Sequence, residues 1–176
     1  MIASSGLSAL LGTKVFCKAE LFQHTGSFKV RGGFNTALSL TEDERARGVI
    51  AFSAGNHAMS VAHVGVTLGV PVTVCMPAHA VQFKVDAVRA MGATLELVEG
   101  DLVAHVMRRR DELGATLIHP FDDPAIVAGH ASAGVEIIED LPEVDTVIVP
   151  VGGGGLISGV AAAIKLAKPD TRIIGV

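Results

Sequence analysis

The chain contains 176 residues, of which 49% are apolar and 18% are charged, with no tryptophan or tyrosine. This composition is typical of a soluble globular protein, and the length allows one sizeable core or two small lobes. The net charge of −4 argues against a nucleic-acid partner, which would require a basic surface. The basic run at residues 108–110 is followed by Asp111 and Glu112, so the pattern predicts a solvated helix face.

Cys17 and Cys75 are the only cysteines, and no CxxC spacing is present. The sequence therefore predicts neither a disulfide framework nor a zinc site, and two isolated thiols suit a reducing compartment. No signal-peptide pattern is visible at the start, so we expect a cytoplasmic protein. Residues 146–164 carry no charge and approach the length of a membrane span, but Pro150 and four glycines interrupt them. We therefore expect no membrane partner and no metal.

Short apolar or β-branched runs alternate with helical patterns along the chain. The runs predict strands at residues 49–52, 71–76, 94–98, 116–119, 146–151 and 172–176. The helical patterns lie at residues 29–40, 56–68, 82–91, 102–113, 125–139 and 156–165. Gly69, Gly92 and Gly114 stand where three of these helices should end. This alternation predicts an α/β fold with open, mostly parallel sheets and helices on both faces.

The first loop of interest, residues 25–33, leads small hydroxyl and glycine residues into a helix. Lys29 lies in the first turn, where a cation opposes the helix dipole. A lysine near backbone amides and a phosphate can form a Schiff base. The alternative from local sequence is a solvent-facing lysine on a surface helix. No other lysine has a glycine- and serine-rich loop beside it in the sequence.

The second and third loops each follow a predicted strand and start a helix. In open α/β sheets, ligands bind at such strand ends. The second loop contains Ser53, Gly55, Asn56 and His57, which suit an anion site or an ordinary helix cap. The third loop has four consecutive glycines, whose backbone can wrap around a phosphate. A dinucleotide fingerprint fails because Ser158 stands where its third glycine is required.

Taken together and in this order, the loops resemble the fold-type-II pyridoxal-phosphate (PLP) enzymes of the threonine dehydratase and serine racemase family. The likeness covers essentially the whole chain, with shorter matches at residues 18–20, 76–77, 84–85, 120–124 and 128–129 and at Glu136. It implies the tryptophan synthase β-like fold with two lobes. Residues 30–136 would form a complete small lobe, and residues 1–29 and 137–176 would form parts of an incomplete large lobe.

The resemblance also implies a role for each matching residue. Lys29 would carry the cofactor as a Schiff base, beside the ring neighbour Phe28. Asn56 would hydrogen-bond the 3′-oxygen of the cofactor ring. The phosphate cup would consist of Gly152, Gly153, Gly154, Gly155 and Leu156. The loop gripping the substrate carboxylate would consist of Ser53, Gly55, Asn56 and His57.

The activity that the resemblance implies is deamination of L-threonine or L-serine to a 2-oxo acid and ammonia, through an aminoacrylate. An amino-acid racemase of the same fold is the alternative, but racemases of the family place a serine where Ala54 stands. A second alternative is a non-catalytic fragment that binds PLP. The family motifs also change at residues 58–60 and at Gly129-His130-Ala131-Ser132, which affects the expected substrate preference. The resemblance implies an amino-acid substrate. We also expect a homo-oligomer, because the sheet edge at residues 172–176 would otherwise be exposed.

Overall fold

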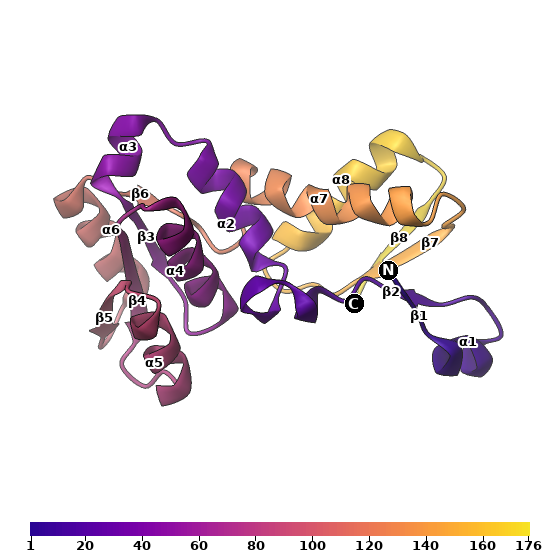
Figure 1. The fold of residues 1–176 in the computed structure, drawn as a ribbon, viewed down its shortest axis with the longest axis horizontal. Helices are drawn as coiled ribbons and strands as arrows, with labels where there is room; N and C mark the ends of the chain where they lie inside the picture. The colour runs from indigo at the N-terminus through magenta and orange to yellow at the C-terminus, as the bar shows by residue number, and fades with distance from the viewer.

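The computed structural model describes residues 1–176 and contains a four-stranded parallel sheet in its first two thirds. The strands are β3 (Val49–Phe52), β4 (Val72–Pro77), β5 (Thr94–Val98) and β6 (Thr116–Leu117). Their order in the sheet is β5-β4-β3-β6 (Figure 1). Because all the pairs are parallel, the strand ends that precede the helices lie on one edge.

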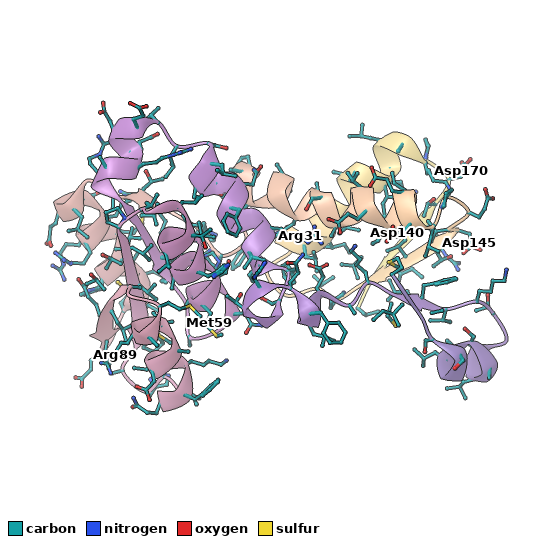
Figure 2. The ribbon with its side chains drawn as sticks, in the orientation of Figure 1. Arg31, Met59, Arg89, Asp140, Asp145 and Asp170 are labelled. Carbon is teal, nitrogen blue, oxygen red and sulfur yellow. The ribbon has the colours of Figure 1, made fainter.

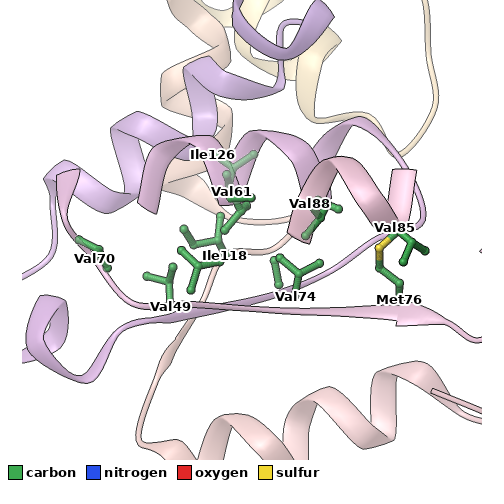
Figure 3. Packing of buried hydrophobic residues seen from close by; sticks show 13 residues of the cluster. Val49, Val61, Val70, Val74, Met76, Val85, Val88, Ile118 and Ile126 are labelled. Carbon is green, nitrogen blue, oxygen red and sulfur yellow. The ribbon is translucent and has the colours of Figure 1, made fainter. Parts of the chain in front are cut away.

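Helices cover both faces of this sheet. Apolar side chains point alternately to the two faces along β3 and β4, so each face needs a covering layer. The helices are α4 (Asn56–Leu68) and α5 (Gln82–Ala90) on one face and α6 (Leu102–Leu113) on the other. Val49, Val74 and Met76 pack with the α4 and α5 side (Figure 3). Ile50 points to the opposite face and packs with Val106 of α6. This part of the fold is therefore a buried three-layer core.

A second parallel pair, β7 (Thr146–Val149) and β8 (Arg172–Gly175), lies at the other end of the molecule (Figure 1). It packs with α7 (Pro124–Asp140) and α8 (Gly155–Ala167) through residues such as Val147 and Ile164. The opposite face of β7 is open, since Ile148 is 63% exposed. Helix α2 (Lys29–Leu38) packs against both α4 and α7 and so joins the two regions.

Several short elements were not predicted from the sequence. They are β1 (Ile2–Ala3), α1 (Ser5–Leu11), β2 (Phe16–Cys17), the 3₁₀ turns η1 (Glu20–Phe22) and η2 (His24–Gly26), and α3 (Glu42–Arg47). Strands β1 and β2 pair antiparallel. Helix α3 starts at a capping box in which Thr41 and Glu44 bond reciprocally. That box is a sequence signal that could have located α3.

The predicted α/β fold with parallel sheets is confirmed, and all six predicted strands and six predicted helices are present. The strand predicted at residues 116–119 is shorter, because only its first two residues pair with β3. Helices on both faces are found for the four-stranded sheet, whereas the β7–β8 pair is covered on one face. The lobe boundaries at residues 30 and 136 stay a prediction. None of the helices combines the length and the apolar character needed to cross a membrane.

Candidate active site

The first and third loops meet around a cavity of about 230 Å³ between α2 and α8. Every cofactor-binding residue predicted from the resemblance lines it, except Asn56. The lining consists of Phe28, Lys29, Phe121, Pro150, Gly152, Gly153, Gly154, Gly155 and Leu156. Phe121 and Pro150 were not predicted as site residues. The arrangement places one amine opposite a glycine-lined helix start.

Lys29 is the first residue of α2, and its side chain is partly buried. Its Nζ donates a hydrogen bond to the carbonyl oxygen of Pro120 and lies 5.3 Å from the centre of the Phe28 ring. Burial lowers the pKa of the amine below its ordinary value. A larger fraction of neutral amine makes Lys29 a better nucleophile and base.

The glycine loop turns from β7 into α8 around the ring of Phe121. A methyl group on Gly153 would lie 2.3 Å from that ring, and one on Gly155 would lie 2.6 Å from the Phe121 carbonyl oxygen. At Gly152 and Gly154, in contrast, nothing lies within 4 Å of the added methyl group. No side chain caps α8, so its first backbone N–H groups are available to an anion.

The second loop lies at the start of α4, outside the cavity lining. Asn56 is exposed, and Ser53 Oγ accepts a hydrogen bond from the Gly55 N–H at 3.0 Å. His57 is 2% exposed and its Nε2 donates to the Ile118 carbonyl oxygen at 2.9 Å. Burial lowers the pKa of His57 to about 4, and the charge of Lys29 contributes to the shift. His57 is therefore neutral near pH 7 and holds the loop from within the core.

Segment 118–121 connects the three loops, although they are far apart in the sequence. Its first residue, Ile118, accepts from His57, and Pro120 accepts from Lys29. The aromatic side chain at its end packs against the glycine loop. Sequence reasoning noted this segment only as the end of a predicted strand and the start of a short family match. Its backbone carbonyls orient the side chains of the other two loops, which no pattern of residue types reveals.

A partly buried ion cluster holds α2 in place beside the site. The guanidinium of Arg31 is 8% exposed and bonds both carboxylate oxygens of Glu20 and of Glu136 at 2.7–2.9 Å. Ser132 accepts another of its N–H groups, and Lys18 pairs with Glu136. These hydrogen bonds raise the pKa of Arg31 and lower the pKa of Glu136 to about 2. The cluster joins residues from η1, α2 and α7 and so sets the direction of the first turn that carries Lys29. Figure 2 labels Arg31 beside α2.

His130 on α7 is fully buried beside the site. Its ring meets the edge of the Phe28 ring at a centroid distance of 4.9 Å, and neither ring nitrogen has a hydrogen-bond partner. Burial lowers the pKa of His130 to about 4. His130 stands where the family motif has another residue. It packs against Phe28, the predicted neighbour of the cofactor ring.

A second polar cluster lies away from the cavity, on the α6 face of the sheet. Cys75 and Glu96 are direct partners on β4 and β5, and His105 lies within 4.8 Å of both. Arg109 occupies both oxygens of Glu96 at 2.9 and 3.2 Å. Because this guanidinium neutralises the carboxylate, the arrangement is an ion-pair network that holds α6 on the sheet.

The fold and the cavity define a class of protein. It is an open α/β protein in which the amine of Lys29 faces a glycine loop suited to phosphate binding. The whole chain, residues 1–176, matches the family described as pyridoxal-phosphate dependent enzymes. The chain belongs to this family, and the resemblance drawn from its loops is confirmed.

Known relatives share the fold and much of the sequence. The chain is 46% identical to an L-threonine ammonia-lyase of Thermotoga maritima, over 98% of this chain and 44% of that protein. It superposes on maize serine racemase with a TM-score of 0.96 at 37% identity, covering 99% of this chain and 54% of that one. For the processed form of threonine deaminase isoform 2 of Solanum lycopersicum the TM-score is 0.94 at 40% identity, covering 98% and 48%. The chain thus spans about half the length of these relatives.

The residues present fit the cofactor that the family implies. Lys29 supplies a partly buried amine, the open space at Gly152 and Gly154 leaves room for a bound group, and the uncapped start of α8 suits its phosphate. Lys84 has no glycine-rich loop beside it in the sequence, but folding brings it near one, since a methyl group built on Gly55 would lie 3.4 Å from its Nζ. The amine therefore lies against the second loop in space.

Proposed function

We propose that the chain carries the site for PLP-dependent deamination of L-threonine or L-serine to a 2-oxo acid and ammonia. The observation that carries the proposal is the Lys29 amine, which faces the glycine loop across one cavity. The sequence likeness to L-threonine ammonia-lyase and to threonine deaminase supports this activity. The protein is proposed to act in the cytoplasm as a homo-oligomer.

In this proposal Lys29 would hold the cofactor through its amine, and the same amine would serve as the base that removes the α-proton of the substrate. Its lowered pKa favours the neutral form that both steps need. The carbonyl of Pro120 keeps the freed amine close to the cavity. The bound cofactor supplies an electron sink that stabilises the negative charge left at the α-carbon.

The remaining site residues bind and orient. Gly152, Gly153, Gly154, Gly155 and Leu156 hold the phosphate at the start of α8, and Phe28 packs beside the ring. Asn56 is proposed to hydrogen-bond the ring oxygen. Ser53, Gly55, Asn56 and His57 are proposed to form the carboxylate loop, with His57 acting from the core rather than by direct contact because its ring is buried.

A racemase is the second candidate, since the chain superposes closely on maize serine racemase. Racemisation needs an acid or base on the far side of the α-carbon. Ala54, the exposed residue at the position where racemases of the family place a serine, has no proton to exchange. Deamination is therefore favoured over racemisation.

The test is a cofactor-loading and 2-oxo-acid release assay on the chain with L-threonine and L-serine, combined with chiral analysis of the remaining serine. We expect cofactor loading that depends on Lys29, with weak deamination at most by the chain alone, and loss of both in Lys29→Ala. Lys14→Ala, which alters an exposed lysine, is the matched control. D-serine as the main product would contradict the proposal in favour of the racemase, and loading without any turnover would favour a non-catalytic PLP-binding module.

A further inference from the structure

His119 lies where the chain leaves the four-stranded sheet and turns toward the cavity. The residue before it, Ile118, is the last one in this segment bonded to the sheet, since its N–H donates to the Ile50 carbonyl oxygen at 2.9 Å. The residue after it, Pro120, already accepts from Lys29 at the cavity. The direction of the chain at His119 therefore decides where that carbonyl points.

The side chain of His119 closes the turn at residues 119–122. Its Nδ1 accepts hydrogen bonds from the N–H groups of Asp122 at 2.8 Å and of Phe121 at 3.3 Å. No backbone carbonyl of the chain accepts from these two N–H groups. Because Nδ1 is the acceptor, the proton of the neutral ring is on Nε2. A side-chain acceptor of this kind fixes a turn that the strand ladder does not reach.

The imidazole ring also connects the turn to two parts of the fold. It meets the ring of Phe52, the last residue of β3, edge to face at a centroid distance of 5.5 Å, and the ring of Phe121 in the same way at 4.9 Å. Phe121 in turn sets the path of the glycine loop, because it leaves no room for a methyl group on Gly153 or on Gly155. The contacts thus run from the sheet through His119 to the glycine loop.

We propose that His119 is a positioning residue of the active site. Its Nδ1 holds the turn that presents the Pro120 carbonyl to Lys29 and the Phe121 ring to the glycine loop. His119 is not among the residues that line the cavity, so it acts through these two neighbours. This inference rests on the proposed function and deepens it.

Three substitutions separate the acceptor atom from the rest of the side chain. In His119→Asn the amide oxygen is bonded to Cγ, as Nδ1 is in histidine, so an acceptor stays in place. In His119→Gln the amide lies one carbon further along the side chain, and in His119→Leu it is absent. His79→Leu, which alters an exposed histidine, is the matched control.

The first readout is the affinity for PLP, measured by titration from the absorbance of the bound cofactor. The dissociation constant should rise about fivefold to thirtyfold in His119→Leu and His119→Gln, because the hydrogen bonds that order the turn are lost. His119→Asn should recover most of the affinity, and His79→Leu should match the unmodified chain. Unchanged affinity in His119→Leu and His119→Gln, or an asparagine variant no better than the leucine variant, would overturn the inference.

The second readout uses the chain without PLP, labelled with ¹⁵N. Because the Phe121 ring packs against Gly153, the Gly153 amide resonance reports the position of that ring. His119→Leu and His119→Gln should shift the resonances of both Asp122 and Gly153, and His119→Asn should shift them less. A shift confined to Asp122 would mean that His119 stabilises only its own turn, against the inference. If the unmodified chain binds no PLP while the Gly153 resonance still depends on His119, the proposed function fails and the link to the glycine loop stands.

Discussion

Strands β3 and β7 have similar apolar sequences but different surroundings. Ile50 in β3 is 0% exposed, because α6 covers the face opposite to α4 and α5. Ile148 in β7 is 63% exposed, because α7 and α8 cover only the other face. An apolar strand sequence therefore predicts burial on both faces only where a second layer of helices is supplied.

The two regions also hold their helices by different means. Around β3 and β4, branched side chains such as Val61 and Val74 fill the space between helix and strand. Between α7 and α8, glycines bring the backbones into contact instead. A methyl group on Gly159 would lie 2.4 Å from the Val127 carbonyl oxygen, and one on Gly134 would lie 2.8 Å from that of Val160. The first region should thus be sensitive to lost volume, and the second to added volume.

The largest expected effect tests lost volume. Ile50→Ala should lower the free energy of unfolding by about 2–5 kcal/mol, because it leaves a cavity in a fully packed core. Ile148→Ala removes the same atoms from an exposed position and should cost less than about 1 kcal/mol. Urea unfolding of the two variants measures the difference. Equal losses would show that the open face of β7 is covered in solution.

Added volume should have a smaller effect. Gly159→Ala should lower the free energy of unfolding by about 1–3 kcal/mol, because backbone rather than a flexible side chain stands in the way. Gly6→Ala in α1 meets nothing within 4 Å and should instead stabilise the chain by about 0.5 kcal/mol. Thermal unfolding of both variants is the measurement. A neutral Gly159→Ala would show that α7 and α8 can move apart freely.

The smallest expected effect, counted per pH unit, concerns the buried histidines, His57 with a hydrogen-bond partner and His130 without one. Burial lowers both pKa values to about 4, so the folded chain binds fewer protons than the unfolded chain below pH 6.5. The contribution of these two histidines to the free energy of unfolding should be fully present above pH 6.5 and should be lost as the pH falls toward 4. In this pH range, His130→Gln should reduce the slope of the free energy of unfolding against pH by up to about 1.4 kcal/mol per pH unit.

The matched control for this prediction is His79→Gln, since His79 is exposed. Urea midpoints collected between pH 4 and pH 7.5 give the slope for each variant. A slope that is the same in His130→Gln and in the unmodified chain would mean that His130 reaches solvent when it is protonated.

The local parts of the fold and site could be predicted from the sequence. The glycine loop, Lys29 and the strand and helix order depend on residues adjacent in the chain, so their patterns are visible. The partner of Lys29 could not be predicted, because the Pro120 carbonyl is a backbone group brought near by folding. The approach of Lys84 to Gly55 could not be predicted for the same reason, since it joins two separate helices.

The short elements were missed for a different reason. Helix α1 has seven residues and buries none of them, so it lacks the apolar stripe that marks longer helices. Its signals were only the Ser4 cap and the left-handed Gly12 at its ends. The open face of β7 escaped prediction because residue type alone does not reveal whether a second layer is present.

The most direct test of the account is to locate the lysine that binds the cofactor. The chain is incubated with PLP, reduced with borohydride, digested and mapped by mass spectrometry. The account predicts the pyridoxyl group on Lys29 and its loss in Lys29→Ala, with Lys14, Lys18, Lys84, Lys165 and Lys168 unlabelled. A pyridoxyl group on Lys84 would contradict it, because that amine lies at the second loop and does not line the cavity.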